Sequence, residues 1–248
     1  MFTPVIIFAV AAIATALSSM SGGGASVINI PVLLWLGVPF PLATAAQKVS
    51  STFWVLPAAY NYLKGKNVDW AFLLVFGALG LVGVYIGVLI VLQVDQRIME
   101  MAVGSIILAL VFHVYLKKEE GLTGRQIRSG LWRSLAYVFA PVLGSYESIL
   151  GSGNGIMFSI ATFHTRGFDF MRALGYYYVV AFPWDVFAAM LLIAKGYSSI
   201  PVMMPMVLGG IMGGYFGSKF ARYKGNKFIK LMFSAVGSIL GLKLIIGI

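Results

Sequence analysis

The residues of this sequence that could do chemistry begin with two clusters of glycine. Gly22–Gly24 and Gly151–Gly155 each lie between apolar stretches, about half the chain apart. Glycine lets a small ligand approach the main chain closely, and a helix that starts after such a cluster presents unpaired N–H groups and the positive end of its dipole. Two such helix ends that face each other would form an anion site. The alternative is that these glycines only bend or pack helices.

Polar side chains within and beside the two clusters could add neutral hydrogen-bond donors that suit the oxygens of an oxyanion. We therefore predict a substrate-binding set that combines both clusters with their neighbouring hydroxyl and amide groups. Its members are Ser21, Gly22, Gly23, Gly24, Ser26, Ser152, Gly153, Asn154 and Gly155.

Ionisable residues within apolar segments form a second group of candidates, because a charge in a bilayer is costly unless it is paired or hydrated. Lys48 follows Gln47 and is either an interfacial lysine that snorkels to the membrane surface or a cation that faces the cavity. Glu147 lies four residues before the second glycine cluster, and Asp185 lies in the middle of its segment. We predict that Glu147 and Asp185 carry a proton or pair with a cation. The alternative is a structural ion pair or a capping role.

Other reactive chemistry has little support in the sequence. The two histidines, His113 and His164, are expected at the membrane interface, and their spacing gives no metal pair. The chain has no cysteine, and it shows no nucleophile–base pair, metal-ligand cluster or nucleotide-binding loop. The sequence therefore predicts no catalytic residue, no metal site and no cofactor, and it argues against an enzyme.

The composition indicates whether the elements that position these residues lie in water or in a lipid bilayer. Hydrophobic residues make up 60% of the 248 positions, charged residues make up 10%, and the mean hydropathy is +0.91. A soluble surface needs far more charge, and the long uncharged runs suit helices rather than the alternating strands of a barrel. The formal net charge of +10 comes mostly from short loops, so we interpret it as a topology signal and predict no nucleic acid partner. The expected fold is an all-α, multi-pass protein of the cytoplasmic membrane.

The hydrophobic runs predict a helical bundle of about eight to ten transmembrane segments. They cover residues 4–20, 25–37, 41–62, 68–93, 97–116, 131–150, 155–164, 170–194, 199–220 and 227–247. The second and seventh runs are too short for a full crossing, and each follows a glycine cluster. We therefore predict that these two runs are half-helices, re-entrant pieces or tilted partial spans.

The two halves of the chain repeat each other. The glycine ladder within residues 80–87 aligns with the ladder within residues 210–217 at a constant shift of 130 residues. We predict two repeats of five segments, residues 1–116 and 131–248, joined by a cytoplasmic linker at 117–130. The ladders themselves are expected to serve close helix packing of the small-xxx-small type.

Basic residues set the expected orientation. The loops at 117–133 and 219–230 each carry five Lys or Arg residues, so both should face the cytoplasm. Five crossings per repeat would invert the second half relative to the first, and the two glycine clusters would then approach one site from opposite faces of the membrane. If the short segments are re-entrant, four crossings per repeat would make the repeats parallel instead.

A family resemblance rests on the order and spacing of short motifs over essentially the whole chain. In the first half these are Ser21–Gly24, Pro31, Leu33, Gly37, the small residues 43–46 with Gln47 and Lys48, Tyr62–Gly65, Val68–Trp70 and the 80–87 ladder. In the second half they are Gly151–Gly155, Arg172, Ala173, Lys195, Gly196 and the 210–217 ladder. Together they resemble the TauE/SafE family of membrane transporters. The resemblance implies export of a small anion such as sulfite or sulfoacetate, and it adds Gln47 and Lys48 to the expected substrate site.

These inferences converge on a secondary transporter that exports a small sulfur-containing anion by alternating access, with Lys48 as a counter-charge. The expected partners are the anion, the lipid bilayer and a coupling proton or sodium ion, and a homo-oligomer stays open. A passive small-anion channel is the alternative, since it would share the site and lack the coupling. Family members often have asparagine where this chain has Gln47, and polar residues where it has Tyr178 and Ala181, which leaves the particular anion open.

Overall fold

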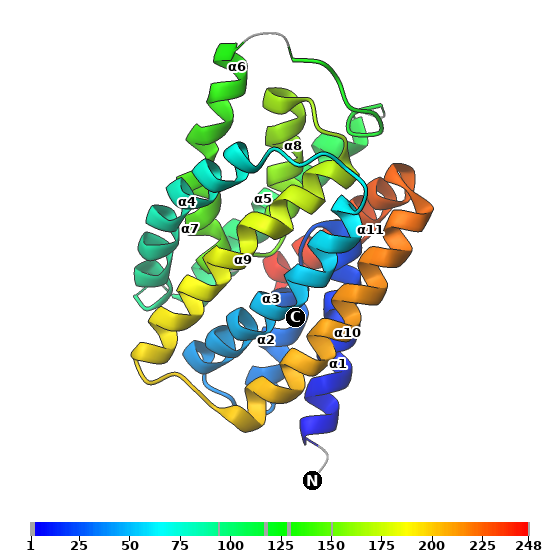
Figure 1. Ribbon diagram of the computed structural model, residues 1–248. Coiled ribbons are helices and arrows are strands. Elements are labelled where there is room, and N and C mark those ends of the chain that lie inside the picture. Colours follow the sequence, from blue (N-terminus) through cyan, green and yellow to red (C-terminus); the bar gives the residue numbers. More distant parts are fainter. Residues whose placement is uncertain (1–2, 94, 117–118, 128–129, 150, 248) are drawn as a thin grey trace.

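The computed structural model of the protein describes residues 3–93, 95–116, 119–127, 130–149 and 151–247. Within these ranges the chain is helical and contains no strand (Figure 1). The elements, in chain order, are α1 (Thr3–Ser21), α2 (Ala25–Trp35), α3 (Phe40–Leu63), α4 (Trp70–Val91), α5 (Gln96–Leu116), α6 (Gly130–Leu135), the 3₁₀ turn η1 (Ala136–Val138), α7 (Phe139–Ile149), α8 (Asn154–Arg166), α9 (Phe170–Ala194), α10 (Ile200–Lys224) and α11 (Asn226–Ile246).

This architecture confirms the predicted all-α fold. Each predicted apolar run coincides with a helix, although the sixth run is divided into α6, η1 and α7. Among the described helices, α1, α4, α9 and α10 are long and apolar enough to cross a membrane. The helices α2 and α8 have 11 and 13 residues, which is short of a full crossing, as predicted. The basic residues Lys117, Lys118 and Arg128, on which part of the predicted orientation rests, lie outside the described residues.

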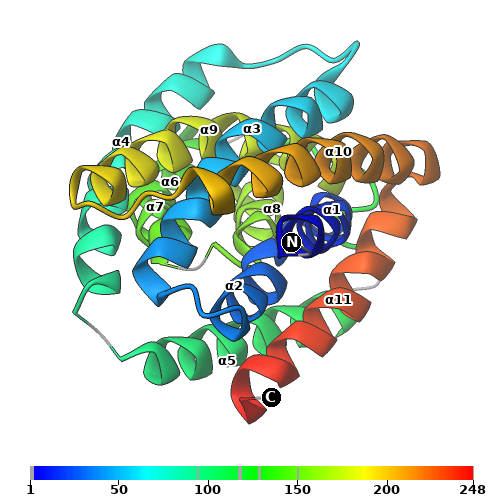
Figure 2. The ribbon, with the colours of Figure 1, turned by 90° about the horizontal axis from the view of Figure 1, so that it is seen from below.

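The helices pack in pairs that join the two halves of the chain. The helix α1 packs along α10 at one edge of the bundle, and α4 packs along α7 at the opposite edge (Figure 1). Between these edges α3 packs against α9. Seen from below, α5 and α11 form a further pair beside α1 and α2 (Figure 2). Each pair therefore combines one helix from before the 117–130 linker with one from after it.

The glycine ladders bring two of these pairs into backbone contact. A methyl group added to Gly83 of α4 would collide with the carbonyl oxygen of Pro141 in α7. One added to Gly213 of α10 would collide with the carbonyl oxygen of Ala12 in α1. Helices approach this closely only where no side chain intervenes. The structure therefore confirms the packing role predicted for the ladders.

Hydrogen bonds from side chains to backbone carbonyls fix the two central helices. Ser50 Oγ of α3 donates to the Met206 carbonyl oxygen of α10 at 2.8 Å. Trp184 Nε1 of α9 donates to the Gly77 carbonyl oxygen of α4, also at 2.8 Å. A polar group at membrane depth needs a partner inside the protein, so each bond restricts how its helix can rotate. The helices α3 and α9 thus have defined faces toward the interior of the bundle.

The ladder contacts lead to a test of stability. We expect Gly83→Ala to lower the free energy of unfolding by about 1–3 kcal/mol, because the new methyl group overlaps backbone atoms that cannot move aside. Thermal unfolding of the purified protein in detergent measures the change.

Gly77→Ala on the same helix is the matched control. Its added methyl group meets no atom within 4 Å, and alanine is the better helix former, so its stability should equal or exceed that of the parent protein. Equal destabilisation by the two substitutions would contradict the backbone contact between α4 and α7.

Candidate substrate and ion site

The structure brings the two glycine clusters into direct contact inside the bundle. A Cβ atom added to Gly23 would lie 2.6 Å from the backbone nitrogen of Gly153, and one added to Gly155 would collide with the carbonyl oxygen of Gly22. Five of these glycines have φ between 66° and 135°, a range that L side chains rarely adopt; they are Gly22, Gly23, Gly24, Gly151 and Gly153. The chain therefore needs glycine here for its backbone conformation and for the close approach of the two turns.

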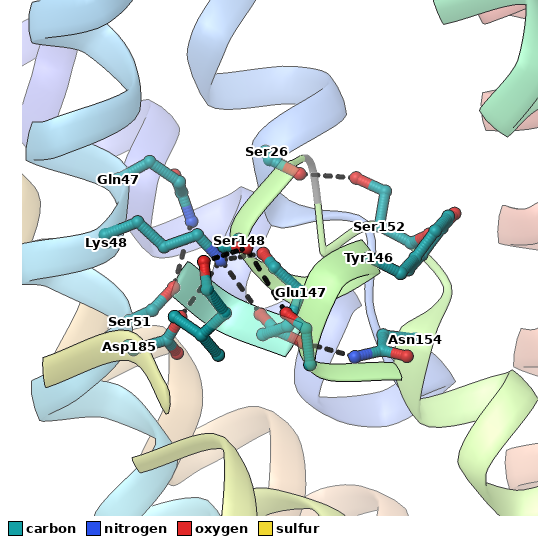
Figure 3. A network of polar contacts seen from close by, with 12 residues as sticks. Ser26, Gln47, Lys48, Ser51, Tyr146, Glu147, Ser148, Ser152, Asn154 and Asp185 are labelled. Atoms are coloured by element: carbon teal, nitrogen blue, oxygen red, sulfur yellow. Dashed lines mark hydrogen bonds and ion pairs between the residues drawn. The ribbon is translucent and has the colours of Figure 1, made fainter. Parts of the chain in front are cut away.

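Each glycine turn leads into the first residue of a short helix. Gly24 precedes α2 and Gly153 precedes α8, so the N-terminal ends of both helices lie at the contact between the turns. The first N–H groups of a helix have no intrahelical acceptor and carry the positive end of its dipole. Ser26 of α2 is hydrogen-bonded to Ser152 across the contact (Figure 3), and the Tyr146 hydroxyl donates to the Ser152 carbonyl oxygen at 2.5 Å. The bond between Ser26 and Ser152 joins the two helix starts, and the bond from Tyr146 holds the second turn against α7.

A buried ion cluster lies beside the two turns. Lys48 Nζ of α3 is 3.0 Å from Glu147 Oε1 of α7 and 3.0 Å from Asp185 Oδ1 of α9 (Figure 3). The same ammonium group donates to the Glu147 carbonyl oxygen. The three side chains are at most 6% exposed, so the interfacial interpretation of Lys48 is wrong. The two acids predicted to carry a proton or pair with a cation therefore share one lysine.

Neutral side chains complete the surroundings of Glu147. Its Oε2 atom accepts hydrogen bonds from the Tyr177 hydroxyl at 2.6 Å and from Asn154 Nδ2 at 2.7 Å. Asn154 is the first residue of α8, and its Nδ2 also donates to the Leu143 carbonyl oxygen at 3.0 Å. The carboxylate thus connects the ion cluster to the start of α8.

A second hydrogen-bonded set extends from Lys48 along α3. Asn29 Nδ2 of α2 donates to Gln47 Oε1 at 2.8 Å, and Gln47 Nε2 donates to Ser51 Oγ at 3.2 Å. These bonds hold Gln47 beside the cluster and attach α2 to α3. Both short helices, α2 and α8, are therefore connected by side-chain amides to the region around Lys48.

A cavity of about 20 Å³, room for roughly one water molecule, lies between the glycine turns and the ion cluster. It is lined by Ser18, Gly23, Gly24, Ala25, Ser26, Gln47, Lys48, Ser51, Trp54, Val55, Glu147, Gly151, Tyr177 and Asp185. Trp54 is 4% exposed, and its Nε1 has no hydrogen-bond partner among the described residues. A buried indole N–H normally has an acceptor, so this donor is a candidate to contact a ligand.

Seven of the predicted substrate and ion residues line this cavity: Gly23, Gly24, Ser26, Gln47, Lys48, Glu147 and Asp185. The others support the turns instead. Ser21 Oγ donates to the Leu17 and Gly23 carbonyl oxygens at 2.9 and 3.0 Å. Gly22, Gly153 and Gly155 form the contact between the turns, and the side chains of Ser152 and Asn154 are bonded to Ser26 and Glu147. Direct contact of these six residues with a substrate stays a prediction.

Seven cavity residues were not among the predicted ones: Ser18, Ala25, Ser51, Trp54, Val55, Gly151 and Tyr177. Ser51 and Trp54 follow Gln47 by four and seven residues, so a helical repeat places them on its face of α3. That spacing could have identified them. Tyr177 is the middle of three consecutive tyrosines, and the sequence does not distinguish it from Tyr178, whose hydroxyl instead donates to the Ser18 carbonyl oxygen at 3.1 Å.

Basic residues gather around the loop between α3 and α4, beside Arg222 of the 219–230 loop, which is predicted to face the cytoplasm. Lys66 lies 4.0 Å from Asp169, at the start of α9. Partial burial lowers the pKa of the Lys66 ammonium group; Asp169 opposes this shift, and the nearby Arg172 and Arg222 add to it. The surplus of positive charge would draw anions toward this face of the protein.

A multi-pass helical bundle with broken helices, a polar cavity and a buried ion cluster has the features of a membrane transporter. The family model "Sulfite exporter TauE/SafE" matches residues 7–244, so the chain belongs to the TauE/SafE family. This confirms the resemblance seen in the sequence.

Two relatives are also described as transporters. The chain is 26% identical over 240 residues to "Probable membrane transporter protein ORF9" of Sinorhizobium sp, covering 96% of this chain and 91% of that protein. It is 19% identical over 233 residues to "Probable membrane transporter protein YdhB" of Bacillus subtilis (strain 168), covering 92% and 94%. No solved structure matches the chain significantly.

The ion cluster leads to a second test. Lys48→Met leaves two buried carboxylates without a counter-charge, and we expect it to lower the free energy of unfolding by about 3–5 kcal/mol. Thermal unfolding in detergent measures this loss. The triple variant Lys48→Met, Glu147→Gln, Asp185→Asn removes every charge of the cluster and should recover part of it.

Lys64→Met, at the exposed C-terminal end of the same helix, serves as the control and should change stability by less than about 0.5 kcal/mol. A triple variant as unstable as Lys48→Met alone would show that unpaired charge is not the cause.

Proposed function

We propose that the protein is a secondary transporter that exports a small sulfur-containing anion, sulfite or an organosulfonate, by alternating access. The matching family is described as sulfite exporters, and two relatives are described as probable membrane transporters. The observation that carries the proposal is the polar cavity between the glycine turns and the cluster of Lys48, Glu147 and Asp185.

Residues that line the cavity carry donors that suit an oxyanion. Trp54 supplies an N–H group that lacks a protein acceptor, Lys48 supplies an ammonium group, and Gly24 and Ala25 lie where the main chain of α2 begins. An anion accepting from Trp54 would satisfy a donor that is otherwise buried without a partner. Sulfite has four non-hydrogen atoms, whereas the cavity has room for about one water molecule. Binding therefore requires a more open conformation, which alternating access supplies.

The charges of the cluster favour coupling to a proton. One lysine and two carboxylates have a net charge of −1 when all three are ionised, and an uncompensated charge at this depth is costly. One proton or one sodium ion on the carboxylate pair makes the cluster neutral. An anion that draws Lys48 toward itself leaves Glu147 and Asp185 without their cation, and a proton or a sodium ion can then take its place. Anion and proton then favour each other's binding, and this linkage couples their movement.

We also propose that residues 1–116 and 131–248 are inverted repeats that carry this movement. The order α1 to α5 corresponds to the order α7 to α11. The contact between α1 and α10 then corresponds to the contact between α7 and α4. In the two other pairs, α3 with α9 and α5 with α11, each helix contacts its own equivalent in the other repeat. A two-fold axis that relates the halves would produce this exchange of partners. The two glycine ladders lie in the two exchanged contacts, which further supports the repeat.

Asp185 provides a test of coupling. In proteoliposomes we expect sulfite efflux by the parent protein to be saturable and to respond to an imposed pH gradient. Asp185→Asn should retain saturable flux within about tenfold and lose the response to the gradient, because one titratable group of the cluster is gone.

Asp169→Asn is the matched control, since Asp169 caps α9 and does not line the cavity; its response to the gradient should persist. Flux through the parent protein that is unsaturable and indifferent to the gradient would instead identify a passive channel. A gradient response that survives in Asp185→Asn would remove Asp185 from the coupling mechanism.

Trp54 provides a test of anion recognition. Trp54→Phe keeps an aromatic ring and removes the unpartnered N–H group, and we expect the apparent affinity for sulfite to fall about 10- to 100-fold if that group contacts the anion. Sulfite binding can be followed by the thermal stabilisation of each purified variant.

Trp184→Phe is the comparison, because the Trp184 N–H group already donates to the Gly77 carbonyl oxygen at 2.8 Å. It should lower stability and leave sulfite affinity unchanged. If the two substitutions weaken sulfite binding equally, Trp54 has no specific role in recognition.

A further inference from the structure

The two histidines of the chain are far apart in the sequence, yet both lie beside the same carboxylate. His113 near the end of α5 and His164 near the end of α8 each place Nε2 beside Glu120 Oε1, at 3.3 and 2.7 Å. Glu120 belongs to the 117–130 linker. We propose that His113, Glu120 and His164 form a binding site for a first-row divalent transition metal of the Zn²⁺ or Co²⁺ type. The sequence spacing of the histidines gave no sign of this site.

The distances suit three ligands of one tetrahedral ion. Metal bonds to imidazole nitrogen and carboxylate oxygen are about 2.0–2.1 Å, which places two ligand atoms of a tetrahedral site roughly 3.3 Å apart. The pair of His113 and Glu120 already has this separation, and the pair of His164 and Glu120 has to open by roughly 0.6 Å. Ligand atoms of all three residues lie within 4.8 Å of one another. To surround an ion, the imidazoles have to rotate, and no pair of ligand atoms has to close by more than about 1.5 Å.

The exposure of the cluster allows an ion to enter. The Glu120 side chain is 9% exposed, whereas His113 and His164 are 38% and 43% exposed. A buried acid and two accessible imidazoles leave the fourth position of a tetrahedral ion open to water. Two histidines and one carboxylate are also a ligand set that zinc and its first-row neighbours prefer over calcium or magnesium.

Hydrogen bonds to main-chain oxygens hold the backbone around Glu120 in place. Lys230 Nζ of α11 donates to the Glu120 carbonyl oxygen at 3.1 Å. Further along the linker, Asn226 Nδ2 donates to the Leu122 carbonyl oxygen at 2.8 Å, and the Arg125 N–H donates to the Gly167 carbonyl oxygen at 2.9 Å. These bonds do not depend on a bound ion, so replacing the Glu120 carboxylate with an uncharged amide should preserve the fold.

Arg125 contacts the ring of His164 on the side away from Glu120. Its Nη2 atom lies 3.4 Å from His164 Nδ1 and donates to the His164 carbonyl oxygen at 3.1 Å. In the metal-free state His164 can donate from Nε2 to Glu120 and accept from Arg125 at Nδ1. An imidazole that binds a metal through Nε2 carries its proton on Nδ1, where it faces the guanidinium group unfavourably. Arg125 therefore opposes metal binding, and its removal should strengthen it.

Titration of the full-length protein in detergent with Co²⁺ tests this site, using a purification tag that contains no histidine. We expect one equivalent of Co²⁺ per chain, visible absorption bands of a four- or five-coordinate ion, and displacement by Zn²⁺, which such ligands bind more tightly. His113→Ala, His164→Ala and Glu120→Gln should each weaken Co²⁺ binding at least tenfold. Arg125→Gln should tighten it severalfold.

Glu119→Gln is the matched control, because it removes the same charge one residue away and should leave Co²⁺ affinity unchanged. Absence of saturable Co²⁺ binding, or full binding by the double variant His113→Ala, His164→Ala, would overturn the proposal. Equal weakening by Glu119→Gln and Glu120→Gln would do the same, since it would reduce the effect to surface charge. Weaker binding in Arg125→Gln would overturn the assignment of His164 Nε2 as a ligand. These readouts do not depend on transport, so they stand apart from the proposed function.

Discussion

The burial of Lys48 between Glu147 and Asp185 is the constraint on which the rest of the structure depends. Helices α3, α7 and α9 must meet at one ammonium group, so none of them can change its depth or rotation alone. Breaking such a cluster costs about 3–5 kcal/mol, yet replacing all of its members by apolar residues is often neutral or stabilising. Stability alone therefore gives little reason to keep three ionisable groups in a bilayer. Under the proposed function, the three groups would serve the movement of an ion or a proton.

The glycine turns and the ion cluster act as one unit. Glu147 lies in the last turn of α7, just before the second glycine turn, and its carboxylate accepts from Asn154 at the first position of α8. Ser152 in that turn is bonded to Ser26 at the start of α2. Glu147 is therefore hydrogen-bonded directly to the start of α8, and the turn that follows it is hydrogen-bonded to the start of α2. Glycine permits this arrangement, because the two turns contact each other through their backbones and have no side chains that would keep them apart.

The sequence predicts the individual parts of this site better than their combination. Run lengths identify α2 and α8 as incomplete spans, and the cost of charge in a membrane singles out Lys48, Glu147 and Asp185. Their pairing spans 99 and 137 residues, which no local pattern encodes. The same reason applies to His113 and His164, since the spacing of two residues in the sequence says nothing about helix ends that a linker brings together. Trp54 illustrates the other limit: its helical spacing from Gln47 was readable, but the missing partner of its N–H group becomes visible only once the packing is known.

The packing also restricts where the proposed alternating-access movement could occur. Ser145 Oγ of α7 donates to the Gly83 carbonyl oxygen of α4 at 2.9 Å, and Thr15 Oγ1 of α1 donates to the Gly210 carbonyl oxygen of α10 at 3.2 Å. These bonds, together with the glycine ladders, join α4 to α7 and α1 to α10 as two close-packed pairs, and sliding within either pair would break hydrogen bonds at membrane depth. Relative movement of the two pairs would have to rearrange the interface between them, where α3 packs against α9. That interface carries Lys48 on one side and Asp185 on the other. Binding of the anion and the proton would alter the Lys48–Asp185 contact. A rocking movement of the two pairs would have to rearrange the same contact.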